Sequence, residues 1–467
     1  MHSRRELLIK GVQGSVLALL AISLPACASQ ALARAKSATA ITQVFGDGVK
    51  LVAVAVEYDS PVDGASLTPT SFEVSGRTVT GAFASTSADP AGRADKGRFV
   101  IVTLSPDDAA AGLAVRVGQR GKPADGSGPG APDGSHPPMR PGGGGGPGGG
   151  GPGKAGDIPT YDTSYPAASA EIMQAQPITL ADGRKVEASA SPLGTTQVKN
   201  PIVDDFRQLE FNDPATGKRL RYNLFVPKDY DANTSYPLVL FMHDAGASSD
   251  QTRTTLFQGL GAVIWASPDD QAKRPAFVLA PQYAEIITDD ESRTSDALDA
   301  TINLIRALAG EYSIDTNRLY TTGQSGGCMM SIAMNIKYPD FFAASFLVAG
   351  QWDPALVKPL AKDKLWILVS QDDAKAFPGQ NAITAALEKE GARISRATWD
   401  GRWSADQFRS AFEKIDAEHS PINYVTFAPG TVIPDGESTA GASGHRNTWR
   451  IAYTIEPIRE WMFRQHK

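Results

Sequence analysis

Two regions of the chain differ in the spacing of their hydrophobic positions. From residue 41 to 117, short stretches alternate apolar and polar residues with a period of two, and clusters of Gly, Pro, Asp and Ser separate them. Many short alternating strands with frequent turns are typical of a β-sandwich. The pattern therefore predicts a sandwich whose first strands lie at residues 50–58, 72–74, 78–80 and 98–104.

Beyond residue 203 strands alternate with helices, as in a sheet that helices cover on both faces. Most of the expected strands are nearly continuous apolar runs, as buried parallel strands require, although the first alternates like an edge strand. These strands lie at residues 220–227, 237–242, 276–280, 319–321, 344–348 and 365–369. One helix face is marked by Leu298, Ile302, Ile305 and Leu308 before Gly310, and a final helix has Pro457 in its first turn. The pattern predicts an α/β-hydrolase fold.

A segment rich in Gly and Pro, residues 118–157, interrupts the first region. Such a segment buries too little apolar surface to offset its backbone entropy, so we expect it to be disordered. Strand-like pieces resume at residues 171–173 and 176–180, which favours an insertion within the sandwich over a hinge between domains. The predicted organisation is a sandwich over residues 40–200 and a catalytic domain over residues 203–467.

The first thirty residues have the pattern of an export signal and are left out of the fold prediction. Residues 3–10 resemble a twin-arginine signal, and residues 11–24 form the apolar stretch that follows it. Residues 24–27 look like a bacterial lipobox with an unusual Pro25, in which Cys27 would carry the lipid. Residues 26–28 would alternatively be a small-residue cleavage site for soluble secretion. The protein is therefore expected to be exported, either to the periplasm, to a lipid anchor at the cell envelope or to the outside.

Charge and cysteine content exclude some classes of protein. The formal net charge of the 467 residues is −6, which argues against a nucleic-acid partner. Besides Cys27 the only cysteine is Cys328, so no structural disulfide is expected, and Cys328 is expected to pack in the core. His, Cys and carboxylate residues do not cluster at the usual ligand spacings, and neither a metal nor an organic cofactor is predicted.

Ser325 is the candidate nucleophile. It is the only serine within a Gly-x-Ser-x-Gly pattern, residues 323–327, between a strand-like run and an apolar helical run. A serine on such a sharp turn keeps its hydroxyl accessible, and the amide of Gly326 points to where an oxyanion would form. The alternative interpretation is a glycine-rich turn that caps a helix.

Position in the chain reduces the candidates for a general base, because this fold places the acid and the histidine after the serine. Of the six histidines, four are excluded: His2 in the leader, His136 in the insertion, His466 at the terminus and His243 before the serine. His445 is favoured because it lies in a loop of small residues before the last helix. His419, at an expected helix end before an edge strand at residues 422–427, stays the alternative.

The acid is expected after the strand at residues 365–369, where Asp372 and Asp373 are adjacent. Asp373 is preferred because it lies further into the loop, and it would orient the imidazole. Asp353, after the preceding strand, is a weaker candidate. An Asp-Asp pair is otherwise most often a helix cap or an exposed turn.

A second oxyanion donor is expected from the small residues that follow the strand at residues 237–242. The amide of Ala245 is preferred and that of Gly246 is the alternative, while His243 is expected to support this loop by hydrogen bonding. Trp352 lies beyond a strand end and is a candidate lining residue of the acyl pocket, although core packing is the commoner position of a tryptophan.

Residues 238–246, 323–327 and 370–379, together with His445, resemble the bacterial esterases of the feruloyl-esterase and polyhydroxybutyrate-depolymerase-like group. Residues 41–48 further resemble members with an immunoglobulin-like esterase N-terminal domain. This resemblance implies Ser325, Asp373 and His445 as a catalytic triad and a sandwich that closes after the insertion. The Gly/Pro-rich segment is a departure from the family.

The predicted function is that of an exported serine carboxylesterase that needs no cofactor and acts on a small or polymer-linked ester. Three alternatives stay open. One is a serine peptidase of the same fold. Another is a surface polymer-binding protein whose hydrolase domain is inactive, and the third is a lipid-anchored structural protein.

Overall fold

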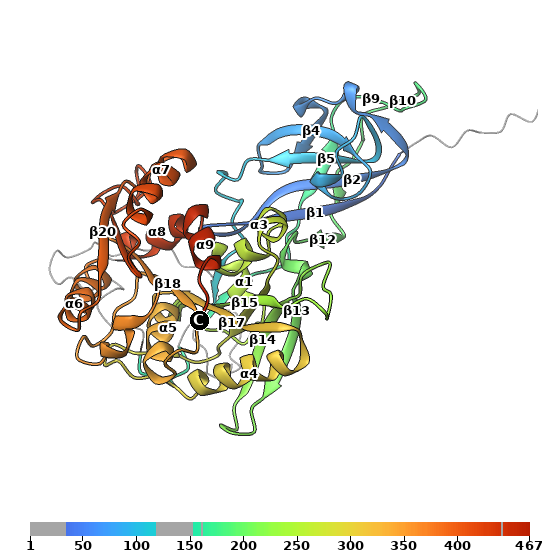
Figure 1. The fold of residues 1–467 in the computed structure, drawn as a ribbon. Coiled ribbons are helices and arrows are strands. Elements are labelled where there is room, and N and C mark those ends of the chain that lie inside the picture. Colours follow the sequence, from blue (N-terminus) through green and yellow to red (C-terminus); the bar gives the residue numbers. More distant parts are fainter. Residues whose placement is uncertain (1–33, 118–152, 160–161, 440–441) are drawn as a thin grey trace, which may run out of the picture.

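The computed structural model describes residues 34–117, 153–159, 162–439 and 442–467, which form two domains side by side (Figure 1). The predicted export signal with Cys27, and residues 118–152 of the predicted insertion, lie outside the described residues. Among the helices in the described ranges, none is both long enough and apolar enough to cross a membrane.

The N-terminal domain is an immunoglobulin-like β-sandwich. Its larger sheet has the order β12-β1-β2-β5-β4 and is formed by β1 (Ala35–Phe45), β2 (Gly48–Asp63), β4 (Val79–Ser85), β5 (Lys96–Leu104) and β12 (Gln197–Lys199). The smaller sheet has the order β11-β8-β3, with β3 (Phe72–Val74), β8 (Glu171–Gln174) and β11 (Leu193–Gly194). Period-two alternation explains the core, because Val54 and Val56 face the sandwich interior with Val100 and Val102, whereas Ala53 and Ala55 belong to a separate cluster.

Strands on both sides of residues 118–152 contribute to the same domain. β6 (Val115–Val117) pairs with β7 (Asp162–Ser164), β8 pairs with β3, and β12 pairs in parallel with β1. Two short strands, β9 (Ile178–Thr179) and β10 (Lys185–Val186), form a hairpin beside them. Strands before and after residues 118–152 thus belong to the sandwich, and β6 and β7 form a two-stranded sheet of their own.

The prediction of disorder is wrong for residues 153–157. The amide of Gly156 donates to the carbonyl of Ile286 at 2.8 Å, and the amide of Ala155 donates to Oδ2 of Asp289 at 3.1 Å. The hydrolase domain thus supplies one backbone and one side-chain acceptor to the amides of a segment that has little apolar surface of its own. Composition does not reveal such partners, which is why the prediction failed here.

The second domain is an α/β-hydrolase built on a sheet of nine strands in the order β13-β14-β16-β15-β17-β18-β19-β21-β20. β14 pairs antiparallel with β13 and β16, and the other pairs are parallel. The strands are β13 (Arg207–Asn212), β14 (Arg219–Phe225), β15 (Tyr236–Met242), β16 (Phe277–Gln282), β17 (Ile314–Gln324), β18 (Ala344–Val348), β19 (Leu365–Ser370), β20 (Ile394–Trp399) and β21 (Ile422–Phe427).

Both edges of this sheet differ from the prediction. β13 and β20 form the edges, so neither β14 nor β21 is an edge strand as expected. β13 was missed because its residues are largely exposed and polar, and β20 because only two of its six residues are fully buried. By contrast every residue of β15, β18 and β19 is buried, which explains their continuous apolar runs.

Helices cover both faces of the sheet, with α4 and α5 along its lower side in Figure 1 and α3, α8 and α9 along its upper side. The helices are α1 (Thr254–Phe257), α2 (Leu260–Val263), α3 (Pro268–Lys273), α4 (Ala297–Glu311), α5 (Gly326–Lys337), α6 (Ala376–Lys389), α7 (Ala405–Asp416), α8 (Ser443–Ala452) and α9 (Glu456–Phe463). α4 ends one residue after Gly310, and Pro457 lies in the first turn of α9, as predicted.

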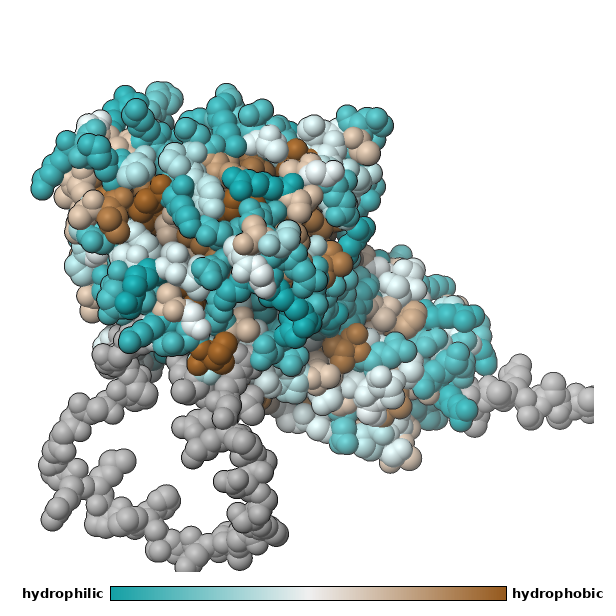
Figure 2. Space-filling model, turned by 90° about the horizontal axis from the view of Figure 1, so that it is seen from below, coloured by the Kyte–Doolittle hydropathy of each residue, from teal (hydrophilic) through white to brown (hydrophobic). Residues whose placement is uncertain are grey.

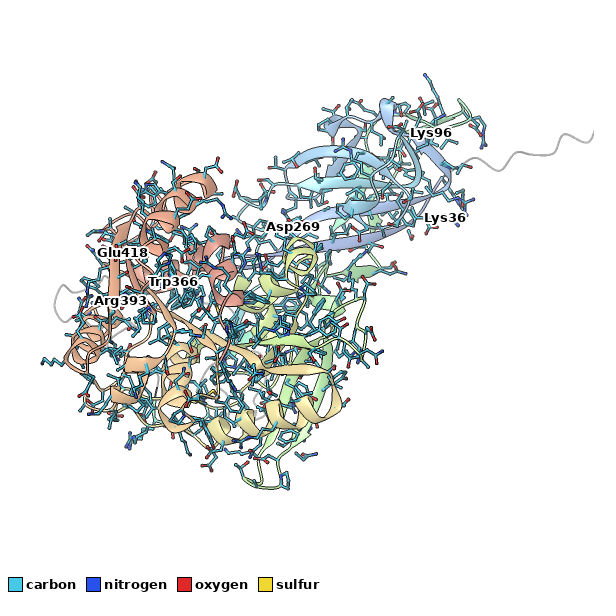
Figure 3. The ribbon with its side chains drawn as sticks, in the orientation of Figure 1. Lys36, Lys96, Asp269, Trp366, Arg393 and Glu418 are labelled. Atoms are coloured by element: carbon cyan, nitrogen blue, oxygen red, sulfur yellow. The ribbon has the colours of Figure 1, made fainter. Side chains whose placement is uncertain are left out.

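Aromatic side chains fill the core between the sheet and the last helices. Trp366 on β19 is fully buried, and its ring centroid lies 5.3 Å from that of Phe412 and 5.5 Å from that of Trp461 (Figure 3). On the face shown in Figure 2, hydrophilic residues predominate and hydrophobic residues occur as separate patches. The core of the hydrolase domain also takes in Val44 and Val49 from the β1–β2 hairpin, so the two domains are packed together.

A buried ion pair fixes α9 to α3. Arg459 is 5% exposed and donates to Asp270 through Nε at 2.8 Å and Nη2 at 3.0 Å. Arg274 adds a third hydrogen bond to the same carboxylate at 2.7 Å. We expect Asp270→Ala to lower the free energy of unfolding by about 3–5 kcal/mol, because it leaves the buried guanidinium of Arg459 without a counter-charge, whereas Arg274 keeps its ion pair with Glu456.

Chemical denaturation followed by tryptophan fluorescence measures this loss. Asp416→Ala is the matched control, since Asp416 pairs with Arg464 at the surface and its removal should cost less than about 1 kcal/mol. Equal losses in the two variants would contradict the role given to Asp270.

Candidate active site

Ser325 lies on the sharp turn between β17 and α5. Its backbone has φ +52° and ψ −117°, a conformation that costs energy for a residue with a side chain. The amide of Ser325 donates to the carbonyl of Val348 on the neighbouring strand at 3.0 Å, which ties the turn to the sheet. The turn therefore presents the hydroxyl at the carboxyl end of the strands, as in a nucleophile elbow.

Two glycines of the motif are required by close backbone approach. A Cβ on Gly323 would lie 2.4 Å from the carbonyl carbon of Gly327, and a Cβ on Gly327 would lie 2.0 Å from the carbonyl oxygen of Met242. Both distances are far shorter than any real contact of a Cβ atom, so larger residues would force the turn open. The spacing of the motif thus has a steric cause in this structure.

Three side chains that are far apart in the sequence form a chain of hydrogen bonds. Nε2 of His445 lies 2.9 Å from Oγ of Ser325, and Nδ1 of His445 lies 2.5 Å from Oδ2 of Asp373. The side chain of Asp373 is 3% exposed and that of His445 is 22% exposed. The imidazole can therefore receive the proton of the serine while its other nitrogen is held by the carboxylate.

The other candidates have different partners. Oδ2 of Asp372 accepts from the amide of Gly430 at 2.7 Å, and Oδ1 of Asp353 accepts from the amide of Ala355 at 2.8 Å. His419 follows α7, and its amide donates to the carbonyl of Asp416 at 3.0 Å. The structure brings Ser325, His445 and Asp373 together. Among the hydrogen bonds of the described residues, none joins Asp372, Asp353 or His419 to these three side chains.

The environment of Asp373 favours its ionised form. Burial acts to raise the pKa of Asp373, but the hydrogen bond with His445 and those from the amides of Ala376 and Lys375 outweigh it. These two amides donate to Oδ1 at 2.8 and 3.0 Å, so both carboxylate oxygens have partners. The pKa of Asp373 consequently lies below its usual value, and the group carries a charge at neutral pH.

His445 lies in the first turn of α8, whereas the sequence indicated a loop. The helix was missed because it begins with Ser443 and Gly444 and continues with polar residues. Gly444 is also needed for close approach, because a Cβ there would lie 2.5 Å from Cβ of Asp372. A helix holds the imidazole in place better than the loop that was predicted.

Trp449 is a neighbour of the site that sequence analysis missed. Its ring centroid lies 4.9 Å from that of His445, and the two rings are nearly perpendicular. The residues are four apart on α8, which places them on the same face of the helix. This spacing would have identified Trp449 if the helix itself had been predicted.

The two expected oxyanion donors meet beside Ser325. A Cβ built on Gly326 would lie 3.5 Å from the amide nitrogen of Ala245. The amide of Gly246 is already engaged, since it donates to Oδ1 of Asp244 at 2.8 Å. Among the described residues the amide of Ala245 has no recorded acceptor, so the geometry favours Ala245 over Gly246.

His243 supports the loop that carries Ala245. It is 1% exposed, its Nε2 accepts from the amide of Tyr283 at 3.0 Å, and its Nδ1 lies 2.7 Å from the carbonyl of Asp244. Because Nε2 is an acceptor, Nδ1 carries the proton and donates to that carbonyl. Burial lowers the pKa of His243, so the ring stays neutral and acts as a support, as expected.

Cys328 and Trp352 are both buried. Cys328 is 0% exposed and burial raises the pKa of its thiol, which fits the expected packing role. Trp352 is 7% exposed and belongs to the core cluster of the hydrolase domain. Its role in lining the acyl pocket stays a prediction.

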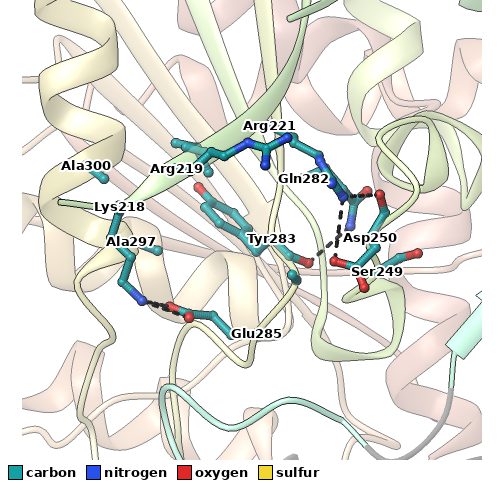
Figure 4. Close-up of a pocket in the computed structure, with 12 residues that line it drawn as sticks. Lys218, Arg219, Arg221, Ser249, Asp250, Gln282, Tyr283, Glu285, Ala297 and Ala300 are labelled. Atoms are coloured by element: carbon teal, nitrogen blue, oxygen red, sulfur yellow. Dashed lines mark hydrogen bonds and ion pairs between the residues drawn. The ribbon is translucent and has the colours of Figure 1, made fainter. Parts of the chain in front are cut away.

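A pocket of about 180 Å³ is lined by Gln282 and Tyr283 among others (Figure 4). Lys218 and Glu285 pair across its edge at 2.8 Å. Its described lining does not include Ser325, Asp373 or His445, so it is not the site of the hydrogen-bonded chain. In the described ranges no group of three or more His, Cys, Asp or Glu residues is arranged to hold a metal ion.

Comparison with known proteins agrees with this architecture. Residues 37–187 match the family described as the esterase Ig-like N-terminal domain. The crystal structure of a thermostable esterase superposes with a TM-score of 0.72 and 27% identity, covering 92% of this chain and 100% of that one. The chain is similar to esterases that have an immunoglobulin-like N-terminal domain. The resemblance and the α/β-hydrolase fold that the sequence predicted are confirmed.

Two curated relatives are also named as esterases. The putative esterase NocK of Nocardia uniformis subsp. tsuyamanensis is 28% identical over 178 residues, which cover 35% of this chain and 48% of that protein. Acetylxylan esterase A of Emericella nidulans is 27% identical over 123 residues, 26% of this chain and 38% of that protein. The chain thus spans half or less of the length of these relatives. These two relatives and the thermostable esterase all carry the name esterase.

Proposed function

We propose that this protein is an exported serine carboxylesterase that cleaves esters through an acyl-enzyme intermediate on Ser325. The observation that carries the proposal is the 2.9 Å contact between Oγ of Ser325 and Nε2 of His445, at a strained turn beside an unengaged amide. A nucleophile, a base and oxyanion donors within reach of one point are the parts that acyl transfer requires.

In the proposed acylation step, Oγ of Ser325 attacks the ester carbonyl while Nε2 of His445 takes its proton. The negative charge that develops on the carbonyl oxygen is accepted by the amides of Gly326 and Ala245. The bond to the leaving oxygen then breaks, and the alcohol departs with the proton from His445. The acyl group stays on Ser325 as an ester.

In the proposed deacylation step, a water molecule gives its proton to His445 and attacks the acyl carbon. The same two amides accept the second oxyanion, and its collapse returns the proton to Ser325 and releases the acid. Asp373 fixes the tautomer that keeps Nε2 free and stabilises the imidazolium that forms in each step. Trp449 limits the orientations of the same ring.

A substrate panel tests the reaction type. Purified protein is assayed with p-nitrophenyl esters of short and long acyl chains, feruloyl esters, a polyester and chromogenic peptides. We expect ester turnover, a burst of p-nitrophenol equal to the enzyme concentration when deacylation is slower than acylation, and labelling by a fluorophosphonate. Peptide cleavage without ester cleavage would favour the peptidase alternative, and absence of labelling would favour an inactive binding protein.

Export is the second part of the proposal, and the leader at residues 3–24 supports it. Cell fractionation with mass spectrometry of the mature N-terminus distinguishes export to a lipid anchor from export by soluble secretion. A diacylated Cys27 in the membrane fraction would support the lipid anchor, and cleavage without acylation would support soluble secretion. A retained leader in the cytoplasm would contradict export without affecting the proposed reaction.

A further inference from the structure

A buried glutamine beside the proposed nucleophile bonds to the residue that begins the oxyanion loop. Gln324 is the last residue of β17 and is 1% exposed. Its Nε2 donates to Oδ2 of Asp244 at 3.0 Å, with Oε1 of Gln258 as a more distant acceptor at 3.4 Å. β15 and β17 are neighbouring strands, with Met242 opposite Gly323, so this contact joins their chains just beyond the last paired residues.

The other oxygen of Asp244 shapes the loop. Oδ1 accepts from the amide of Gly246 at 2.8 Å, and the carbonyl of Asp244 accepts from the amide of Ala247 at 3.1 Å. These bonds define the single 3₁₀ turn η5 (Ala245–Ala247), with Asp244 as its N-cap. They take up the amides of Gly246 and Ala247 and leave that of Ala245 without a recorded acceptor among the described residues.

We propose that Gln324 and Asp244 are a positioning pair that sets the Ala245 amide for the oxyanion. The inference rests on the proposed function and adds two residues that act through the oxyanion loop and touch no substrate. Gln324 donates to one oxygen of the Asp244 carboxylate, and the other oxygen accepts from the amide of Gly246. Since Gln324 is bonded covalently to Ser325, the pair couples the position of the nucleophile to that of the second donor.

The charge on Asp244 gives the glutamine a second effect. A carboxylate close to a developing oxyanion opposes the negative charge, and this opposition weakens when donors are bonded to both of its oxygens. Gln324 and Gly246 supply these donors. A glutamate at position 324 would instead set two acceptors against each other, at nearly unchanged volume.

Isosteric substitutions separate positioning from packing. We expect Gln324→Glu and Asp244→Asn each to lower kcat about 10- to 100-fold with KM nearly unchanged, since a displaced donor acts in the transition state. In the Asp244→Asn variant the introduced amide nitrogen would face Nε2 of Gln324, donor against donor. The double variant should recover most of kcat, because the amide at position 244 then donates to the carboxylate at position 324.

An arylboronic acid gives a readout of the oxyanion site itself, since it forms a tetrahedral adduct with the serine. Its inhibition constant should rise in the single variants in parallel with the loss of kcat and fall again in the double variant. Gln174→Glu is the matched control: Gln174 is a buried glutamine of the sandwich that donates to the carbonyl of Val186, so its loss should lower Tm and leave kcat unchanged.

The outcomes distinguish this inference from the proposed function. Unchanged kcat in both single variants, or a double variant no better than the product of the single losses, would overturn the positioning pair while wild-type turnover upholds the esterase. A wild-type protein that neither hydrolyses any ester nor reacts with a fluorophosphonate would overturn the proposed function itself.

Discussion

Replacing Ser325 with alanine should lower kcat for ester hydrolysis by about 10⁵- to 10⁶-fold, which is the size of effect expected when a triad loses its nucleophile. The substitution removes only Oγ, the atom that lies 2.9 Å from Nε2 of His445. The oxyanion donors and the binding surface stay in place and account for the activity that remains. Initial rates with p-nitrophenyl acetate, normalised to protein concentration, measure the loss.

The same variant should keep its fold. Alanine retains Cβ, so the strained backbone at φ +52° is neither relieved nor worsened, and Tm should stay close to that of the wild type. Ser331→Ala is a suitable control on the same helix, since Ser331 is fully buried and bonds to Thr321 away from the hydroxyl of Ser325. It should lower Tm with little loss of kcat.

Residues that act as a unit give losses that do not add. The double variant Ser325→Ala with His445→Ala should therefore be about as inactive as Ser325→Ala alone. If Ser325→Ala turned over esters at the wild-type rate, the nucleophile would have to lie elsewhere in the chain. Multiplicative losses in the double variant would show that the two side chains act independently.

The central part of the fold and the three site residues could be predicted from local signals. Fully buried parallel strands such as β15 and β19 must be apolar at every position, so their sequences stand out without any alignment. The turn at Ser325 has glycines because the backbone of Gly323 closely approaches that of Gly327, and the backbone of Gly327 closely approaches that of Met242. Chain order and elimination then reduced the choice of histidine to two.

The missed features depend on partners that are distant in sequence. Edge strands β13 and β20 gain their structure from one neighbouring strand each, and their residues lack a buried pattern of their own. The contact of Gln324 with Asp244 joins residues eighty positions apart. Residues 153–157 are ordered by the loop at Ile286 and Asp289, which composition alone cannot indicate.

The choice between adjacent aspartates leads to the second large effect. Asp373→Asn should lower kcat by about 10⁴-fold, because an amide that faces Nδ1 of His445 favours the wrong tautomer of the ring. In the wild type, Oδ2 of Asp373 lies 2.5 Å from Nδ1 of His445 and is part of a charged carboxylate. Asparagine would place either its amide nitrogen or an uncharged oxygen there. Steady-state kinetics across the pH range in which the wild type is stable measure the loss.

Asp372→Asn is the matched control, since Asp372 is adjacent and bonds to the amide of Gly430 instead. Its kcat should stay close to the wild-type value, and a larger loss here than in Asp373→Asn would reverse the assignment.

Stability gives an independent check of the charge on Asp373. Because the pKa of Asp373 is lowered in the folded state, its ionised form stabilises the fold above its ordinary pKa of 3.8, and this contribution is lost as the pH falls through the lowered value. The stability gap between wild type and Asp373→Asn should therefore narrow in acid, whereas a gap that widened there would contradict a charged Asp373.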